Sequence, residues 1–393
     1  ARASIATGRY PHSNGVMGLA HHPFNWHLPS SERHIASILR DAGYRTAIFG
    51  LQHVTGPDKV RDLGFGEIYL TPNASALNVA PMVVDWLSRN RNNGPFYIEI
   101  NLFEVHRPWD RYKMDLTRGV QPPRWLPPWP GYGRELGKLQ GAIYVLDWGI
   151  GRIIRAIREF RLFDNTLFIF TVDHGLDLPG AKATLHDPGV EVALMMSCPN
   201  CGIGGGRRVK ALTSHVDLLP TILDVLDIKP PSNVQGVSLM PLIKGNAVSV
   251  RDFVIAEKTY HEKYDPVRAI RTSRFKLIMH FEAMDIEDEA IDSKLSPAHS
   301  AIADELAIPN EFIELYDLEK DPLELHDVSR EPEYGNVLKE LLSKLYNVLK
   351  ETNDPILNGP IPSPHYYQAL RILKGEEQLP PRVQLTPPYQ GWW

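Results

Sequence analysis

Three apolar segments of the sequence, each predicted to be a strand, end in polar side chains that could do chemistry. FYIEINLF is followed by EVHRP, TLFIFTV by DHG, and RTAIF by GLQH. In open α/β sheets, ligands bind beyond the carboxyl ends of the strands. We therefore expect His53, His106 and the pair Asp173 and His174 to lie at one site.

The residue types in this set favour an oxyanion assisted by a metal ion. Asp173 and His174 are adjacent, and each can donate one ligand to a divalent cation. His106 and Arg107 place two cationic groups at one strand end, where an anion would compensate them. Lys182 follows in the GAKAT loop. Taken singly, His174 is equally well explained as a hydrogen-bonded histidine, and Lys182 as a solvated lysine.

Length and composition limit the class of protein. The chain has 393 residues, 43% hydrophobic and 23% charged, which predicts two globular domains with a large core. A net charge of −5 disfavours a protein that binds nucleic acid or an anionic membrane. No apolar run approaches the roughly 18 residues of a membrane-spanning helix.

The order of predicted elements divides the chain into three parts. Residues 1–248 alternate strand-like and helix-like segments, which predicts an α/β fold with a mostly parallel sheet sandwiched by helices. Within it, SSERHIASILRDAG is expected to be a helix capped by serine. Residues 249–352 contain consecutive short strands and one helix, which predicts a smaller α+β domain with an antiparallel sheet. Residues 353–393 are proline-rich and expected to be an extended C-terminal segment.

The chain contains two cysteines, Cys198 and Cys201, in the segment SCPNCG. A structural zinc site needs four ligands, and the sequence offers no second cysteine pair. We therefore favour a surface loop that carries two thiols or a local disulfide.

Several segments together resemble the sulfatase family of the alkaline phosphatase superfamily. RASIATGRYPHSNGV is similar to the end of the family signature, in which Cys-x-Pro-Ser/Ala-Arg precedes a helix that ends in Thr-Gly. Further landmarks occur in the family's order: AGYRTAIFG, the His-Arg-Pro, FDNTLFIFTVDHG, HVDLLPTILDVLDI, QGVSLMPLIKG and ELYDLEKDPLELHDV. VMGLAHHPFNWH, IFGLQHVTGPDKV and KETNDPIL resemble the heparan N-sulfatases (sulfamidases) in particular.

The resemblance implies roles for four catalytic residues. Arg2 would hold the hydrate of a formylglycine, and His53 would assist that group. His106 would bind the sulfuryl group and protonate the leaving atom, and Lys182 would contact a sulfate oxygen. In this register the cysteine that becomes formylglycine is expected three residues before Ala1, so the chain as printed is expected to be inactive.

The resemblance also implies a metal site and substrate contacts. Asp173 and His174 would form half of a site for one Ca²⁺. Arg107, together with His261 and Arg268 from the second domain, is expected to contact the sugar.

One departure from the family pattern bears on activity. The family's Gly-Lys-x-His appears here as GLQH, with Leu51 in place of the lysine. Loss of one cation from such a site can lower a rate by on the order of 10²-fold or more.

The leading hypothesis is a sulfatase that acts on N-sulfoglucosamine of heparan-type glycans. The alternatives are an O-sulfatase or a phosphate or phosphonate monoester hydrolase on the same fold, and a catalytically degenerate binder of sulfated glycans. We expect a sulfated saccharide as partner, no nucleic acid and no membrane span, with a homodimer as one possible state. A periplasmic, secreted or lysosomal-like location is favoured over a cytoplasmic one.

Overall fold

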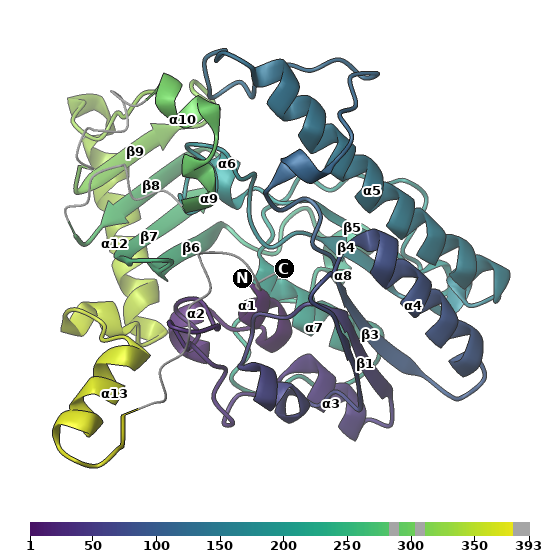
Figure 1. Ribbon diagram of the computed structural model, residues 1–393. Coiled ribbons are helices and arrows are strands. Elements are labelled where there is room, and N and C mark those ends of the chain that lie inside the picture. Colours follow the sequence, from purple (N-terminus) through teal and green to yellow (C-terminus); the bar gives the residue numbers. More distant parts are fainter. Residues whose placement is uncertain (283–290, 303–310, 380–393) are drawn as a thin grey trace.

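The computed structural model describes residues 1–282, 291–302 and 311–379. A helix-flanked parallel sheet and a four-stranded antiparallel sheet lie side by side in it (Figure 1). The N-terminal helix α1 (Arg2–Thr7) lies between these two parts. This arrangement agrees with the predicted α/β fold followed by an antiparallel sheet.

The parallel sheet has the strand order β2-β1-β3. Its strands are β1 (Arg45–Gly50), β2 (Glu67–Leu70) and β3 (Phe96–Asn101). Both pairings of β1 are parallel, and Phe49 lies opposite Tyr69 on one side and Ile100 on the other. The carboxyl ends of the three strands therefore meet at one edge of the sheet.

Helices cover both faces of this sheet because successive side chains of a strand point to opposite faces. Phe49 packs with Val83 and Ile153 on one face, and Ile48 packs with Ala36 on the other. The helices that provide these contacts and the adjoining core are α4 (Ala76–Asn90), α5 (Tyr132–Glu159), α3 (Ile35–Asp41) and α7 (Leu218–Val225). The expected serine cap of α3 is instead His34, whose Nδ1 accepts from the Ala36 amide over 3.1 Å.

The predicted strand TLFIFTV is present as β4 (Phe168–Thr171). Among the described residues it pairs antiparallel with β5 (Leu194–Ser197) in a two-stranded sheet. The connection between them contains only the short helix α6 (Asp187–Val190). A parallel pairing is usually joined by a crossover helix that packs on the sheet, and this connection has only a helix of four residues.

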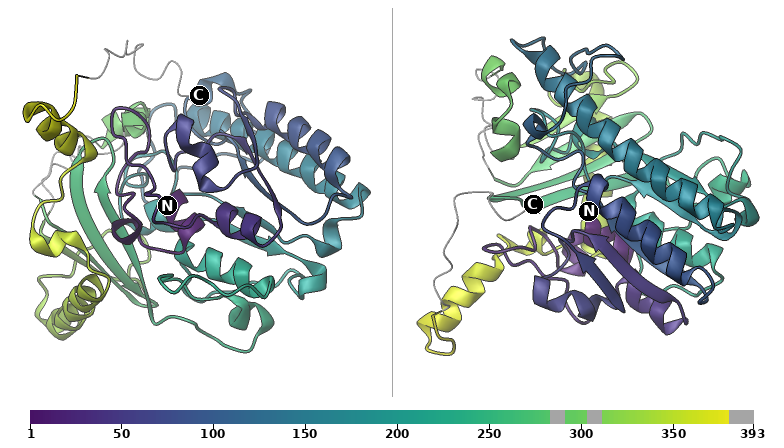
Figure 2. Two further views of the ribbon diagram at one scale, coloured as in Figure 1. Left: turned by 90° about the horizontal axis from the view of Figure 1, so that it is seen from below. Right: turned by 45° about the vertical axis from the view of Figure 1, so that its right-hand side comes forward.

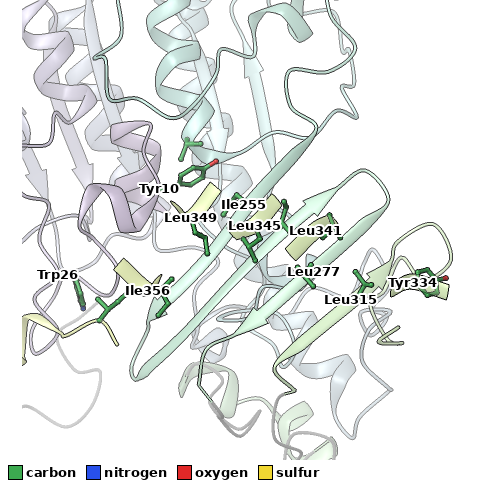
Figure 3. Close-up of a cluster of buried hydrophobic side chains, with 13 residues drawn as sticks. Tyr10, Trp26, Ile255, Leu277, Leu315, Tyr334, Leu341, Leu345, Leu349 and Ile356 are labelled. Atoms are coloured by element: carbon green, nitrogen blue, oxygen red, sulfur yellow. The ribbon is translucent and has the colours of Figure 1, made fainter. Parts of the chain in front are cut away.

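The second part of the chain is an antiparallel sheet in the order β6-β7-β8-β9. Its elements are β6 (Phe253–Tyr260), β7 (Tyr264–Thr272), β8 (Phe275–His280), β9 (Ile313–Asp317) and α12 (Gly335–Glu351). Leu341 and Leu345 of α12 pack on Ile255 and Leu277 of the sheet (Figure 3). The i,i+4 spacing of the leucines places them on one helix face.

The proline-rich C-terminal segment is only partly extended. After the short turn η7 (Pro355–Asn358), residues form α13 (Pro364–Leu373), which lies at the margin of the molecule (Figure 2). The Ser363 hydroxyl accepts from the Tyr366 amide over 3.2 Å, and Pro364 takes the first helical position, where its missing N–H costs nothing. These two features start a helix where we expected extended chain. Most of the final stretch LPPRVQLTPPYQGWW lies outside the described residues.

Smaller features complete the fold. Cys198 and Cys201 form a disulfide and Cys198 is fully buried, so the local-disulfide interpretation is correct. Within residues 1–282, 291–302 and 311–379, no helix combines the length and the apolar character needed to cross a membrane. The remaining short α-helices are α2 (Pro11–Asn14), α8 (Met240–Lys244), α9 (Ile291–Lys294) and α10 (Pro297–Ala301).

Candidate active site

An ion pair between Arg2 and Asp173 forms the centre of the candidate site. Arg2 begins α1, and its Nε donates to Oδ2 of Asp173, which follows β4, over 2.8 Å. Burial acts to raise the pKa of Asp173, but the charges of Arg2 and His174 hold that pKa well below its usual range. The carboxyl group of Asp173 is therefore ionised at neutral pH and can bind a cation.

His174 presents a second potential metal ligand beside Asp173. Its Nδ1 lies 2.9 Å from the carbonyl oxygen of Gly175, which can only accept, so Nδ1 carries the hydrogen. Nε2 keeps its lone pair and lies 3.7 Å from Oδ1 of Asp173. An imidazole and a carboxylate fit half of a divalent-metal site. Among the described residues, no third His, Cys, Asp or Glu joins these two in a metal-binding group.

Lys182, His106 and Asp177 form a hydrogen-bonded chain. Nζ of Lys182 lies 3.3 Å from Nε2 of His106 and 3.3 Å from Oδ2 of Asp177, and both Lys182 and Asp177 are buried. Nδ1 of His106 lies 2.7 Å from the carbonyl oxygen of Arg107, so Nδ1 donates and Nε2 accepts from the ammonium. The Ser293 hydroxyl donates to Oδ1 of Asp177 over 3.1 Å. These hydrogen bonds fix the positions of the Lys182 ammonium and the His106 imidazole.

His53, in the loop after β1, lies close enough to these groups for their charges to act on it. Burial lowers the pKa of His53 to about 3, with Arg2, His21 and His106 also lowering it and Asp173 raising it. The rings of His21 and His53 have centroids 5.4 Å apart. The ends of β1, β3 and β4 thus bring His53, His106 and Asp173 into one neighbourhood with Arg2, as the sequence analysis expected.

Two residues of this neighbourhood were missed from the sequence. Nε2 of His215 donates to the carbonyl oxygen of Val172 over 3.0 Å, directly before Asp173. Burial lowers the pKa of His215 to about 4, and the charges of Asp173 and His174 also act on it. The sequence placed His215 only at the start of a helix. Asp177 lies between DHG and Lys182 in the sequence. An acidic residue only five positions before Lys182 was the signal that could have identified it.

Arg107 does not face a substrate. It is 6% exposed, its Nε donates to the carbonyl oxygen of Asp177 over 2.8 Å, and its Nη2 pairs with Glu135. Its guanidinium also stacks 3.8 Å above the ring of Trp109. The expectation that Arg107 contacts the sugar is therefore wrong. Glu135 compensates its charge, and protein groups accept its hydrogen bonds.

Arg268 is also internal, which corrects the second expected sugar contact. Its side chain is fully buried, and Nε and Nη2 donate to the two oxygens of Asp354 over 2.6 and 3.1 Å. Nε lies 3.8 Å from Glu257, whose Oε2 is 2.5 Å from Nδ1 of His12. A fully buried guanidinium cannot contact a sugar. The sequence pattern of β7 gave no indication that this arginine points into the core.

His12, Glu257 and Asp354 have the spacing of a possible metal-binding group. The positive charge of Arg268 already lies against both carboxylates, and the amide of His12 donates to Glu257 over 2.7 Å. A buried cation that is bidentate to Asp354 occupies the position that a metal ion would need. We therefore interpret this cluster as an ion-pair network.

His261 lies in the turn between β6 and β7. Its Nδ1 is 3.7 Å from Glu262, and its amide donates to the carbonyl oxygen of Lys263 over 3.2 Å. The side chain is 28% exposed, so a contact with a bound molecule is sterically open to it. Its role as a substrate contact stays a prediction.

The helix-flanked parallel sheet followed by an antiparallel sheet is the alkaline phosphatase-like α/β fold that solved sulfatases share. Residues 1–228 match the family model described as Sulfatase. The chain therefore belongs to the sulfatase family. Residues 180–304 match a second model, described as N-sulphoglucosamine sulphohydrolase, C-terminal.

Individual relatives agree with this assignment. The chain is 25% identical to N-sulphoglucosamine sulphohydrolase from Homo sapiens over 91% of this chain and 82% of that protein. It is 31% identical to an ulvan-active sulfatase from Formosa agariphila over 49% of this chain and 39% of that protein. A solved 2-O GAG sulfatase shares the fold with a TM-score of 0.70 and 20% identity, covering 92% of this chain and 83% of that one.

Proposed function

We propose that this chain acts on a sulfated sugar, and that its substrate is N-sulfoglucosamine at the end of a heparan-type glycan. The observation that carries the proposal is the joint placement of Arg2, His106 and Lys182 beside the ionised Asp173. Three cationic or proton-carrying groups at one place suit an oxyanion such as a sulfuryl group. The match of residues 180–304 to the N-sulphoglucosamine sulphohydrolase model supports the choice of sugar.

Lys182 and His106 would act on the sulfuryl group and the leaving atom. Hydrolysis of a sulfamate breaks the S–N bond, transfers sulfur to a water oxygen and leaves a nitrogen that takes up a proton. Nε2 of His106 would deliver that proton when the imidazole enters the reaction protonated, and Lys182, 3.3 Å away, would keep its own proton and its charge. The positive charge of Lys182 would stabilise the sulfuryl oxygens.

Arg2, His53 and Asp173 would serve the nucleophile side of the reaction. The resemblance expects a formylglycine there, and the Arg2 guanidinium would orient it. His53 is neutral at neutral pH because of its lowered pKa, so one ring nitrogen can accept a hydrogen bond from the nucleophile. Asp173 and His174 would hold Ca²⁺, which when bound supplies positive charge that favours an ionised hydroxyl.

Leu51 favours a second candidate, a binder of sulfated glycans without turnover. It packs against the core cluster that contains Phe49 and Phe103 and so adds no charge where the family has a lysine. The remaining cations, Arg2 and Lys182, would still attract a sulfate group. Binding without catalysis is the behaviour that distinguishes this candidate.

The disulfide between Cys198 and Cys201 supports an oxidising location for the protein. Such bonds persist in secreted, periplasmic and related compartments and are rare in the cytosol. We therefore propose an exported or lysosomal-like protein, in agreement with a substrate found in extracellular glycans.

The test is sulfate release by the protein expressed from its full gene. We expect N-sulfoglucosamine to release sulfate, measured by ion chromatography, faster than glucosamine 6-O-sulfate or a phenyl phosphonate ester. His106→Ala and Lys182→Met should each lower kcat by about 10²-fold. A preference for the phosphonate would refute the proposed substrate class. Tight saccharide binding with no release of sulfate from any substrate would favour the glycan binder.

A further inference from the structure

A second site lies away from the Arg2–Asp173 ion pair, beside α13. It is a surface cavity of about 370 Å³ between two segments that are far apart in the sequence. One wall is the loop after α2, with Asn25, Trp26 and His27, and the other is α13 with the residues before it. Figure 1 shows α2 and α13 near one another on the same side of the molecule.

The walls of this cavity are flat and mostly apolar. Trp26 and Tyr367 supply aromatic rings, and Pro362 and Pro364 supply saturated rings. Tyr367 is 50% exposed, so its ring is open to a ligand, whereas Trp26 is largely buried. A pyranose has one face of C–H groups that fits such a surface, and aromatic side chains combine apolar contact with a polar edge.

The polar groups that line the cavity suit the charged substituents of an anionic sugar. Arg371 is the one described lining residue with a formal charge, since burial and the nearby Lys59 lower the pKa of His27. Nε of Arg371 forms an ion pair with Glu377 over 2.7 Å, and the Arg371 side chain is 50% exposed, so a ligand can still reach it beside that carboxylate. The guanidinium of Arg371 is matched to a sulfate or carboxylate.

The loop that forms one wall also reaches the candidate active site. His21 contacts His53 there, and Trp26 lies five residues further along the same loop. Five residues of chain span at most about 17 Å, so the cavity is within reach of a short oligosaccharide that starts at the active site. The loop from His21 to His27 thus connects the candidate active site with this cavity.

The cavity is held in shape by contacts with the β6–β7 hairpin. The Tyr260 hydroxyl donates to the carbonyl oxygen of Ile361 over 2.7 Å, and the Ile361 amide donates to the Tyr264 hydroxyl over 3.0 Å. The rings of Trp26 and Tyr260 have centroids 5.2 Å apart. Tyr260 therefore contacts both walls and Tyr264 holds the second, so a ligand would meet a preformed surface.

We propose that this cavity binds a distal unit of an anionic oligosaccharide whose terminal sulfated sugar lies at the active site. The proposal rests on the proposed function, because it takes its ligand class from it. It adds a site for the part of the glycan that is not hydrolysed, formed by Tyr367 and Arg371. Longer saccharides should therefore bind more tightly than the single sugar.

The test is binding of a heparin-derived tetrasaccharide and of N-sulfoglucosamine, each measured by calorimetry on the full chain. Tyr367→Ala and Arg371→Gln should weaken the tetrasaccharide about tenfold and leave the monosaccharide unchanged. Tyr367→Phe, which keeps the ring, should bind almost as the unchanged protein does. Tyr346→Ala, at a similarly exposed tyrosine on α12, is the matched control and should change neither affinity.

The outcomes separate this proposal from the proposed function. Equal affinities for the two saccharides, or equal losses for both in Tyr367→Ala, would overturn the distal site and leave the function standing. Absence of binding by either saccharide would overturn both. Loss of a dimer on Tyr367→Ala, seen by analytical ultracentrifugation with unchanged saccharide binding, would assign this face to a second copy of the chain and refute the proposal.

Discussion

Nζ of Lys182 lies 3.3 Å from Nε2 of His106 and equally far from Oδ2 of Asp177. The buried carboxylate thus compensates the buried ammonium and aims it at the imidazole. Asp177 is a positioning residue in this arrangement, because it acts through Lys182.

Replacement of Asp177 by Asn should therefore lower kcat while KM changes little. We expect a decrease of about tenfold to 10²-fold, because the ammonium loses the anion that holds it charged and in place. The alkaline limb of the pH–rate profile should also move to lower pH, which a purely structural defect would not cause. Ser293→Ala, which removes only a hydroxyl from the other carboxylate oxygen, is the milder control. An unchanged pH profile with normal folding would argue against the positioning role.

Calcium should stabilise the protein through Asp173 and His174. The ionised Asp173 and the lone pair on Nε2 of His174 are available as ligands. At 100 times its dissociation constant, one ion adds about 2.7 kcal/mol to the free energy of unfolding. We expect thermal unfolding of the full-gene protein to shift upward with Ca²⁺ and back with a chelator. The shift should vanish in Asp173→Asn, and its persistence there would place the ion elsewhere.

The buried network around Arg268 should contribute strongly to stability. Arg268→Met leaves Asp354 and Glu257 buried without their cation, which should cost about 3–5 kcal/mol. Arg330→Met is the matched control, since Arg330 pairs with Glu311, both side chains are exposed at 79% and 55%, and the loss should be at most about 1 kcal/mol. Urea unfolding measures both values, and similar losses would contradict the role given to burial.

Stability should fall in acid through carboxylates whose pKa is lowered in the folded protein. Although burial alone would raise it, the pKa of Asp187 lies below its ordinary 3.8 because of Lys276 and Arg271, and that of Glu257 below its ordinary 4.5 because of Arg268 and His12. A lowered folded pKa gives stability that is complete above the ordinary value and is lost as pH falls below it. We expect the unfolding midpoint to decline from about pH 5 downward.

Asp187→Asn provides the check on this pH dependence. It should destabilise the protein at pH 7, and the difference from the unchanged protein should shrink as pH falls below 3.8, because the folded-state pKa of Asp187 lies below that value and its carboxyl group loses its charge only there. A difference of constant size across this range would mean that packing, and not charge, accounts for the effect.

The elements that hold the site were predictable because their patterns are local. The apolar runs of β1, β3 and β4 and the helical spacing in α5 and α7 identify elements from neighbouring residues alone. The antiparallel pairing of β4 with β5 was not predictable in this way, because it depends on which strand lies beside β4 in space. The start of α13 was missed because the high proline content of the segment was given more weight than the helix cap at Ser363.

By itself, the sequence determined which residues end strands, and hence that His53, His106 and Asp173 could meet. Tertiary structure decided which arginines are available, because burial depends on packing between distant segments. Arg107 and Arg268 carry the same charge as Arg2 in the sequence, yet Glu135 and Asp354 pair with them inside the protein. Only the folded chain shows that Asp177 compensates Lys182, since an ion pair needs two side chains to point at each other.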